Sequence, residues 1–145
     1  MVRLSAKTEY ASLAMLELAR RQHDEEPVRI REIADAHAVP SRFLVQILLQ
    51  LKAAGLVTST RGAAGGYRLA RNASAITLAD IHEVFDGPPD VSTSQGQDVS
   101  LSRAGEVLLN AWQEVARREH EALEDHDLAT LASRAEADSE TMYYI

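Results

Sequence analysis

The sequence contains no cysteine among its 145 residues. This absence excludes disulfide bonds, a thiolate nucleophile, and zinc or iron–sulfur centres held by cysteine sulfur. No apolar run approaches the roughly 18 residues that a membrane span requires. Arg3, Lys7 and Glu9 interrupt the stretch where a secretory signal would need its apolar segment. We therefore expect a cytoplasmic protein without a membrane segment.

Acidic residues are missing from the middle of the chain. Residues 1–76 contain 11 Lys or Arg and 7 Asp or Glu, a net charge of +4, whereas residues 77–145 contain 4 and 15, a net charge of −11. No acidic residue occurs between Asp35 and Asp80, and that window holds Arg42, Lys52, Arg61, Arg68 and Arg71. A surface that faces phosphates avoids carboxylates in this way. An ordinary solvated surface with uneven charge fits the same composition.

The chain also lacks the arrangements typical of an enzyme. Three of its histidines are isolated from any partner for acid–base chemistry: His23, His37 and His82. The glycine-rich segment 62–66 has no following Lys-Ser/Thr, which a nucleotide-binding loop requires. His120 and Glu124 would share one helix face, as a metal-binding pair does, but acidic helix ends are usually just solvated. We predict no enzymatic activity, no cofactor and no metal.

The first half of the chain predicts two helices, a turn and a third, amphipathic helix. Residues 7–21 are apolar around most of a helix, and a shorter helix fits residues 31–37. Pro40 bars continuation of the second helix and can start the third, which spans about residues 41–54. The apolar face of the third helix consists of Phe43, Leu44, Ile47, Leu48 and Leu51. Its other face carries Arg42, Val45, Gln46 and Leu49.

A basic hairpin follows the third helix. Gly55 fits a left-handed helix cap, and residues 56–60 have strand character. The segment Arg61-Gly62-Ala63-Ala64-Gly65-Gly66-Tyr67-Arg68-Leu69 predicts a turn and a return strand, because glycine permits the positive φ of hairpin turns. These parts make a winged helix-turn-helix, in which the third helix enters the major groove of DNA. Thr77 and Asp80 can cap a further helix over residues 78–85.

The C-terminal part predicts a long helix with an apolar seam. Residues 90–100 have no periodicity and should form a loop, whereas residues 101–123 form the helix and residues 128–135 a last short one. Positions three and four apart make the seam: Leu101, Ala104, Leu108, Ala111, Val115 and Ala122. Such a seam can pack on the protein's own core. Pairing with a second copy is the preferred interpretation, since a two-fold protein matches a palindromic operator.

The predicted fold is therefore mainly α with a small β-wing. A winged helix-turn-helix DNA-binding domain spans residues 1–86, and a loop spans residues 87–100. The dimerisation helix and C-terminal tail span residues 101–145.

Several motifs carry a family resemblance in one order along the chain. At the wing, Leu51-x-x-Ala54-Gly55-Leu56-Val57 precedes Arg61-Gly62-x-x-Gly65-Gly66-Tyr67-x-Leu69. Three further segments match the same pattern: Arg3-Leu4-Ser5-x-Lys7-x-Glu9-Tyr10-Ala11, Ser41-x-x-Leu44-x-Gln46-Ile47-Leu48 and Ala75-Ile76-Thr77-Leu78-x-Asp80-Ile81. Together they resemble the Rrf2 family of bacterial regulators. The likeness is clear to about Asp86 and weaker through Trp112 and residues 127–131.

The resemblance implies a homodimer that joins through the long C-terminal helix and binds palindromic DNA. It places Gln46 at the family's base-reading glutamine, with Arg42 and Phe43 beside it, and Arg61 at the wing arginine that enters the minor groove. Glutamine can bind adenine through two hydrogen bonds, and arginine suits a narrow minor groove. Val45 replaces a glutamate that tunes site choice in some members, so the target sequence does not carry over.

One departure from the family concerns its sensor. Cluster-binding members have three cysteines in the loop and early long helix, whereas residues 90–106 here have none. Ser94 aligns with the first cysteine and Ser100 roughly with the second. Glu9 aligns with an acidic residue that ligates the cluster in some members, but a metal site needs several convergent donors. The resemblance therefore implies a regulator without the sulfur-based switch.

We predict a homodimeric DNA-binding transcription regulator that acts as a repressor. The predicted DNA contacts are Gln46, Arg42, Phe43, Ser41, Arg61, Gly62, Lys7, Arg68 and Arg71. One alternative is a protein-interaction module whose acidic C-terminal half binds a regulatory partner such as a metabolic enzyme. Another is a small-molecule or metal sensor that uses the loop over residues 90–100.

Overall fold

The computed structural model describes residues 4–89, 91 and 102–143, with side chains described only as far as residue 137. In chain order its elements are α1 (Ala6–Arg20), α2 (Ile30–His37), α3 (Ser41–Ala53), β1 (Val57–Thr60), β2 (Gly66–Leu69), a 3-10 turn (Ala73–Ala75), α4 (Leu78–Asp86), α5 (Arg103–Glu124) and α6 (Leu128–Tyr143). The mainly helical fold with a β-wing is confirmed. Within the described residues, no helix is both long and apolar enough to cross a membrane.

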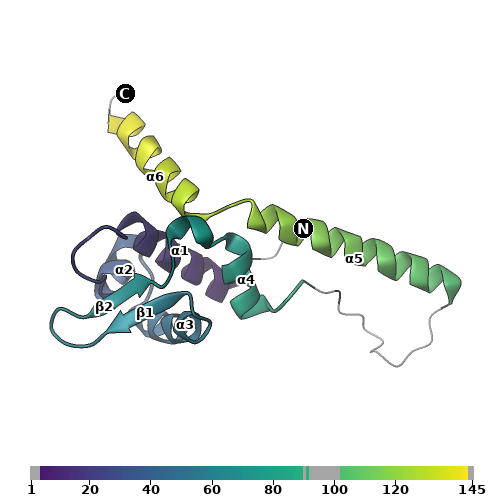
Figure 1. Ribbon diagram of the computed structural model, residues 1–145, viewed down its shortest axis with the longest axis horizontal. Helices are drawn as coiled ribbons and strands as arrows, with labels where there is room; N and C mark the ends of the chain where they lie inside the picture. The colour runs from purple at the N-terminus through teal and green to yellow at the C-terminus, as the bar shows by residue number, and fades with distance from the viewer. Residues whose placement is uncertain (1–3, 90, 92–101, 144–145) are drawn as a thin grey trace.

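Helix α1 lies at the centre of a helical body (Figure 1). It packs against α3, α4 and α6 and contacts β2. Ala11, Ala14, Met15 and Leu18 are completely or almost completely buried. Small alanines on α1 let the neighbouring helices approach closely, and α3 contributes Leu44, Leu48 and Leu51 to the same core. This packing fixes α3 on the outside of the body with one face turned to solvent.

The turn between α2 and α3 sets the direction of α3. Ala38 has φ 53° and ψ 39°, a left-handed conformation that ends α2, and Val39 is buried in the core. Pro40 then caps α3 with φ −60° and cannot donate the hydrogen bond that would continue α2. The predicted helix-turn-helix is present with these boundaries.

The hairpin is built against the segment before α2. Strands β1 and β2 are antiparallel, with Val57 opposite Leu69 and Thr60 opposite Gly66. Val28 adds one bridge to the outer side of β2: the Tyr67 N–H donates to the Val28 carbonyl oxygen at 2.7 Å, and the Val28 N–H donates back at 2.9 Å. A Cβ on Gly66 would lie 2.5 Å from that same Val28 oxygen. The second glycine of the Gly65-Gly66 pair is therefore required by this close approach.

Helix α5 projects away from the helical body (Figure 1). The Ser102 hydroxyl accepts a hydrogen bond from the Gly105 N–H and caps its start, and none of its residues is buried. At its end the chain returns to the body, where the Leu78 N–H donates to the His126 carbonyl and the Leu128 N–H donates to the Ile76 carbonyl. These two bonds anchor the base of the projecting helix.

Helix α6 is longer than the predicted span of residues 128–135, since it continues to Tyr143. It packs on α1, and Leu128 and Ala132 belong to the hydrophobic core. The division into segments 1–86, 87–100 and 101–145 stays a prediction. The structure shows in addition that the last segment returns to the helical body through α6. Most of the predicted loop over residues 90–100 lies outside the described residues.

Candidate nucleic-acid interface

The outward face of α3 carries the predicted base-reading residues. Leu44, Ile47, Leu48 and Leu51 face the core, whereas Ser41, Arg42, Val45, Gln46 and Leu49 are exposed. In a helix, residues three and four apart lie on one side, so Arg42, Val45, Gln46 and Leu49 form a single stripe. We call these four residues the α3 stripe. It begins in the first turn of the helix, which is the part of a recognition helix closest to base edges.

Phe43 belongs both to the apolar positions of the third helix and to the predicted DNA contacts, and the structure leaves it partly exposed. Its side chain is 44% exposed, because it sits at the edge of that face beside α1. Its ring stacks on Tyr10 of α1, with centroids 6.1 Å apart and planes 28° apart. The Arg42 guanidinium carbon lies over the same ring, 5.0 Å from its centroid. A cation–π contact of this kind holds Arg42 at the start of the α3 stripe.

Lys7 and Ser41 lie on the same side of the molecule as the start of α3. Lys7 is exposed and precedes Tyr10 by one helical turn, so both residues face the side of α1 that meets Phe43. Ser41 is the first residue of α3 and is also exposed. These placements are compatible with the predicted phosphate contacts.

A second basic surface lies between α3 and the wing. Arg61 and Gly62 are exposed at the turn of the hairpin, and Gly62 has φ 107°, which favours glycine. They line an open groove together with Arg29, Lys52 and Leu49. No carboxylate lines this groove, so its electrostatic character suits a phosphate backbone. We call it the wing groove.

Sequence reasoning missed two cations of the wing groove. The Lys52 ammonium donates to the Ser59 hydroxyl at 2.6 Å, and the Arg29 guanidinium donates to the carbonyl oxygen of Ala63. Lys52 belongs to the acid-free window but was not among the predicted DNA contacts. Arg29 lies outside that window, among acidic residues, so the sequence held no signal for it.

Glu32 positions the backbone of Arg29. Its carboxylate accepts a hydrogen bond from the Arg29 N–H at 2.9 Å at the start of α2. That bond, together with Arg21, holds the pKa of Glu32 below its ordinary range. Glu32 therefore stays ionised at neutral pH and keeps the start of α2 capped beside the groove.

Arg68 and Arg71 lie elsewhere. The Arg68 guanidinium donates to the carbonyl oxygens of Asp24 and Glu25, which fastens the loop after α1 to β2. Arg71 lines a different hollow, together with Asp80 and Glu83. Neither position adds to the α3 stripe or the wing groove.

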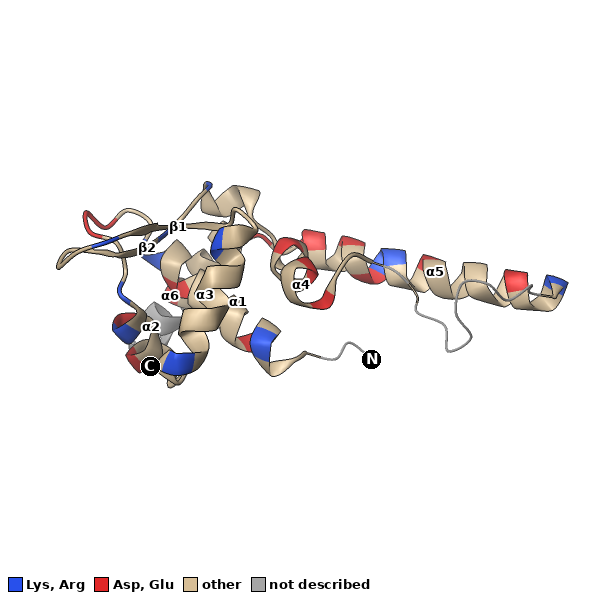
Figure 2. Cartoon of the chain, turned by 90° about the horizontal axis from the view of Figure 1, so that it is seen from below, with Lys and Arg blue, Asp and Glu red and all other residues tan. Residues whose placement is uncertain are grey.

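Opposite charges are separated in space as well as in sequence (Figure 2). Acidic residues recur on α4 and along α5, where some basic residues lie between them. The hairpin and α3 carry basic residues and no acidic ones. Such a separation orients a molecule toward a polyanion with its basic end first.

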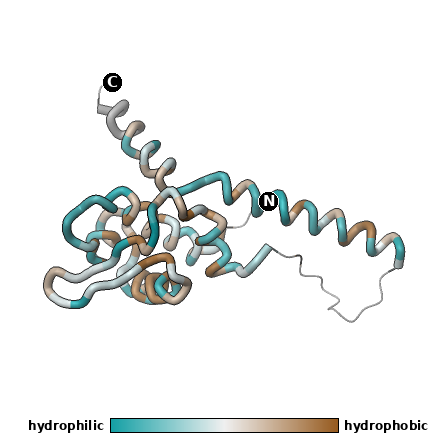
Figure 3. The backbone as a smooth tube through the Cα atoms, in the orientation of Figure 1, coloured by the Kyte–Doolittle hydropathy of each residue, from teal (hydrophilic) through white to brown (hydrophobic). Residues whose placement is uncertain are grey.

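Side chains on one side of α5 form the exposed apolar seam. Val107, Leu108, Trp112 and Val115 are 54–60% exposed, and Ala104, Ala111 and Ala122 are also exposed. Leu101 of the predicted seam lies outside the described residues. The half-buried Ala116 and Leu123 instead line the hollow between α5 and the end of α4. Figure 3 shows the apolar positions recurring along the projecting helix.

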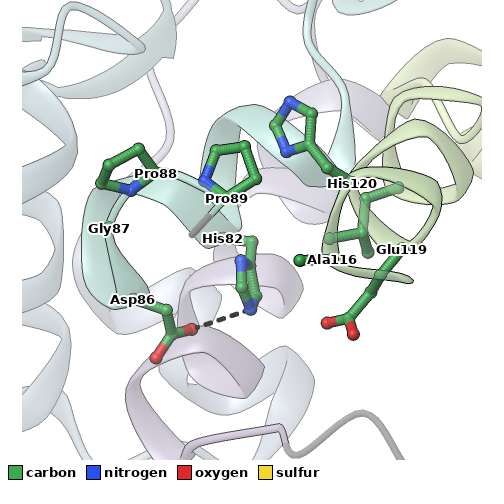
Figure 4. A pocket seen from close by; sticks show the side chains of 9 residues that line it. His82, Asp86, Gly87, Pro88, Pro89, Ala116, Glu119 and His120 are labelled. Atoms are coloured by element: carbon green, nitrogen blue, oxygen red, sulfur yellow. Dashed lines mark ion pairs between the residues drawn. The ribbon is translucent and has the colours of Figure 1, made fainter. Parts of the chain in front are cut away.

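A small histidine-lined hollow of about 150 Å³ separates the end of α4 from α5 (Figure 4). His82 and His120 line it, with Asp86 and Glu119. Each imidazole has a carboxylate partner: His82 Nε2 is 3.3 Å from Asp86 and His120 Nε2 is 2.8 Å from Glu124. No group of three or more His, Asp or Glu is arranged to hold a metal ion among the described residues. The prediction of no metal stays a prediction.

Comparisons with known proteins agree on one family. Residues 4–134 match the Rrf2 family model, described as an iron-dependent transcriptional regulator. The chain is 32% identical over 145 residues to the HTH-type transcriptional regulator CymR of Bacillus subtilis, which covers 99% of this chain and 100% of CymR.

Solved structures give the same result. The structure of CymR (YrzC), the global cysteine regulator of B. subtilis, matches with a TM-score of 0.77 and 33% identity, covering 92% of this chain and 98% of that one. The T. potens IscR structure matches with a TM-score of 0.72 and 33% identity, covering 92% and 88%.

Proposed function

Because the chain belongs to the Rrf2 family of transcriptional regulators, we propose that it binds palindromic operator DNA as a homodimer and represses transcription. Family membership makes it a DNA-binding regulator. The homodimer, the palindrome and repression are the parts we add. In a bacterium, such a protein acts in the cytoplasm, where the chromosome lies.

The observation that supports this proposal most strongly is the α3 stripe. It presents the Gln46 amide and the Arg42 guanidinium to solvent on a helix whose opposite face is buried in the core. In the major groove, an amide can bind adenine and a guanidinium can bind guanine, each through two hydrogen bonds. The wing groove, with Arg61 and Lys52 and without a carboxylate in its lining, would suit a neighbouring stretch of the DNA backbone.

The exposed seam of α5 supports the homodimer. Four large apolar side chains recur at helical spacing on one face of the projecting helix and form a continuous exposed apolar surface. A second copy of α5 packed in a two-fold arrangement would cover them and place two α3 helices on one duplex. Palindromic half-sites follow from that two-fold symmetry.

Iron has no part in the proposed mechanism. A chain without cysteine cannot hold an iron–sulfur cluster through cysteine sulfur. The described residues contain no preformed group of three or more His, Asp or Glu donors. The donor set of this chain therefore does not fit the cluster of its iron-dependent relatives, and no regulatory step is assigned to it.

A selection from random duplexes tests the proposal. The full chain is incubated at low salt with a randomised duplex library, and bound sequences are enriched over several rounds. We expect an inverted repeat whose half-sites are separated by about one helical turn. Enrichment of direct, unrepeated or random sequences would contradict the palindromic homodimer.

A further inference from the structure

The α3 stripe contains two apolar side chains between its polar ones. Val45 is 41% exposed and Leu49 is 50% exposed, although both lie on the face that carries Arg42 and Gln46. They are four residues apart and so lie in one line along the helix. Nothing else in the described chain covers them to the extent that the core covers Leu44 or Leu48.

Unmodified DNA offers one apolar partner to such side chains. In the major groove, each base pair presents hydrogen-bond donors and acceptors, and thymine alone adds a methyl group, at C5. An aliphatic side chain that faced a donor or acceptor there would leave that group without a partner, at a cost in free energy. The neighbouring wing groove holds the cations Lys52 and Arg61 and no carboxylate. This charge pattern favours a nucleic acid over a protein as the partner of the α3 stripe.

We propose that Val45, with Leu49 behind it, selects operators by contact with thymine C5-methyl groups. This inference rests on the proposed function, since it assumes that α3 enters the major groove. Arg42 is held by the Phe43 ring in the first turn, and Gln46 follows Val45 directly. Each half-site should therefore contain thymine next to the base that Gln46 reads, and Leu49 should contact a second thymine farther along the groove.

Replacing thymine by deoxyuridine tests the methyl contact alone, because uracil differs from thymine only by that methyl. Each thymine of the selected palindrome is replaced in turn, symmetrically in both half-sites, and the dissociation constant of the full chain is measured at fixed salt. Burial of one methyl group corresponds to about a fourfold change in affinity, hence about fifteenfold for two half-sites. We expect this loss at one or two positions per half-site and no change at the others.

Two variants test which side chain causes the loss of affinity on thymine-to-uracil replacement. In Val45→Ala the thymine-to-uracil ratio at one sensitive position should fall to about one, and Leu49→Ala should do the same at the second position where there is one. Gln46→Ala is the matched control on the same helix face. It should weaken binding while leaving both ratios unchanged, because it removes an amide and not the methyl contact.

The possible outcomes distinguish a failure of methyl recognition from a failure of DNA binding. If the selected palindrome has no thymine in its half-sites, or wild type binds every uracil duplex equally well, methyl recognition is overturned and DNA binding stands. If Val45→Ala keeps full sensitivity at every position, the assignment to Val45 is overturned. If the chain enriches no sequence at all, the proposed function fails and this inference fails with it.

Discussion

Gly65 shows how a single residue shapes the proposed DNA-binding surface. Its burial in the hairpin leaves no room for a side chain, since a Cβ would collide with the carbonyl oxygen of Thr60 and approach the Gly62 oxygen to 2.9 Å. Both obstacles are backbone atoms, which cannot move aside like the end of a flexible side chain. The loop that carries Arg61 therefore depends on glycine here.

Gly65→Ala should lower the free energy of unfolding by about 1–3 kcal/mol, the usual cost of forcing extra atoms into a packed site. Urea denaturation measures this change. Ala64→Ser, an exposed neighbouring position, is the matched control and should stay within about 0.5 kcal/mol of wild type. Equal stability of Gly65→Ala and wild type would contradict the close packing of the hairpin.

Alanine substitutions of Gln46 and Lys52 should impair DNA binding in different ways. Gln46→Ala should relax base preference within the half-site, because it removes a base contact. Lys52→Ala should weaken binding to all sequences and reduce the slope of log affinity against log salt by about one for each phosphate that the variant no longer neutralises.

Arg71→Ala removes the same charge from outside the wing groove and is the control for Lys52. Its salt slope should match that of wild type, because Arg71 lines a hollow away from the wing groove whose lining also includes Asp80 and Glu83. Binding assays from low to moderate salt compare the three variants. A slope that falls for Arg71→Ala and not for Lys52→Ala would place the phosphate backbone on the other side of the hairpin.

At the scale of elements, α6 depends on its first turn for its place on α1. The Asp127 carboxylate accepts hydrogen bonds from the Thr130 N–H at 3.0 Å and the Thr130 hydroxyl at 2.7 Å. These bonds hold the pKa of Asp127 below its ordinary value, with the Thr130 hydroxyl as the largest cause. They fix the start of the helix next to the buried Leu128.

Asp127→Ala should lower the free energy of unfolding by about 1 kcal/mol at pH 7, as loss of a helix cap usually does. The contribution of a carboxylate with a lowered pKa is present above the unfolded pKa of about 3.9 and is lost as the pH falls through the folded value. The difference between wild type and variant should therefore shrink in acid.

Chemical denaturation at several pH values measures that difference, with Asp125→Ala as a control for the removal of a nearby charge. Asp125 is exposed and ends α5 rather than starting α6. A difference for Asp127→Ala that grows in acid would contradict the capping role.

Elements with strong local signals could be predicted from the sequence. The 3.6-residue periodicity of α3, the Pro40 break and the Thr77–Asp80 capping box depend on neighbouring residues, and the structure contains all three. How much of Phe43 is exposed could not be predicted, because periodicity places a residue on a face and says nothing of how far a neighbouring helix extends over that face.

The place of α6 could not be predicted for a related reason. Its packing on α1 joins residues more than a hundred positions apart, and apolar periodicity does not identify the partner of a helix. Arg29 was missed because its approach to the wing follows from the bridge between Val28 and Tyr67, a long-range pairing.

At the scale of the whole molecule, α3 and the hairpin carry the proposed DNA-binding surface, and the acidic helix α5 projects from the body that holds them. Leu108 lies near the middle of the exposed seam and is 60% exposed in the single chain. Among the described residues, α4 packs on the C-terminal part of α5. The seam is exposed in the single chain, so a second copy can pack on it.

Leu108→Glu should prevent dimer formation, because a buried carboxylate without a partner is costly at an apolar interface. Gln113→Glu introduces the same charge at an exposed α5 position away from the seam and should leave the dimer intact. Sedimentation velocity measures the oligomeric state of each. A monomeric wild type, or a dimer that survives Leu108→Glu unchanged, would contradict pairing through this seam.

The most direct test of the central claim, sequence-specific DNA binding by this chain, is a ratio of affinities. The full chain is titrated into the selected palindrome and into a shuffled duplex of equal length and composition at the same physiological salt concentration. We expect the palindrome to bind at least about a thousandfold more tightly, the lower end of the range for specific regulators. A ratio near one would contradict the account.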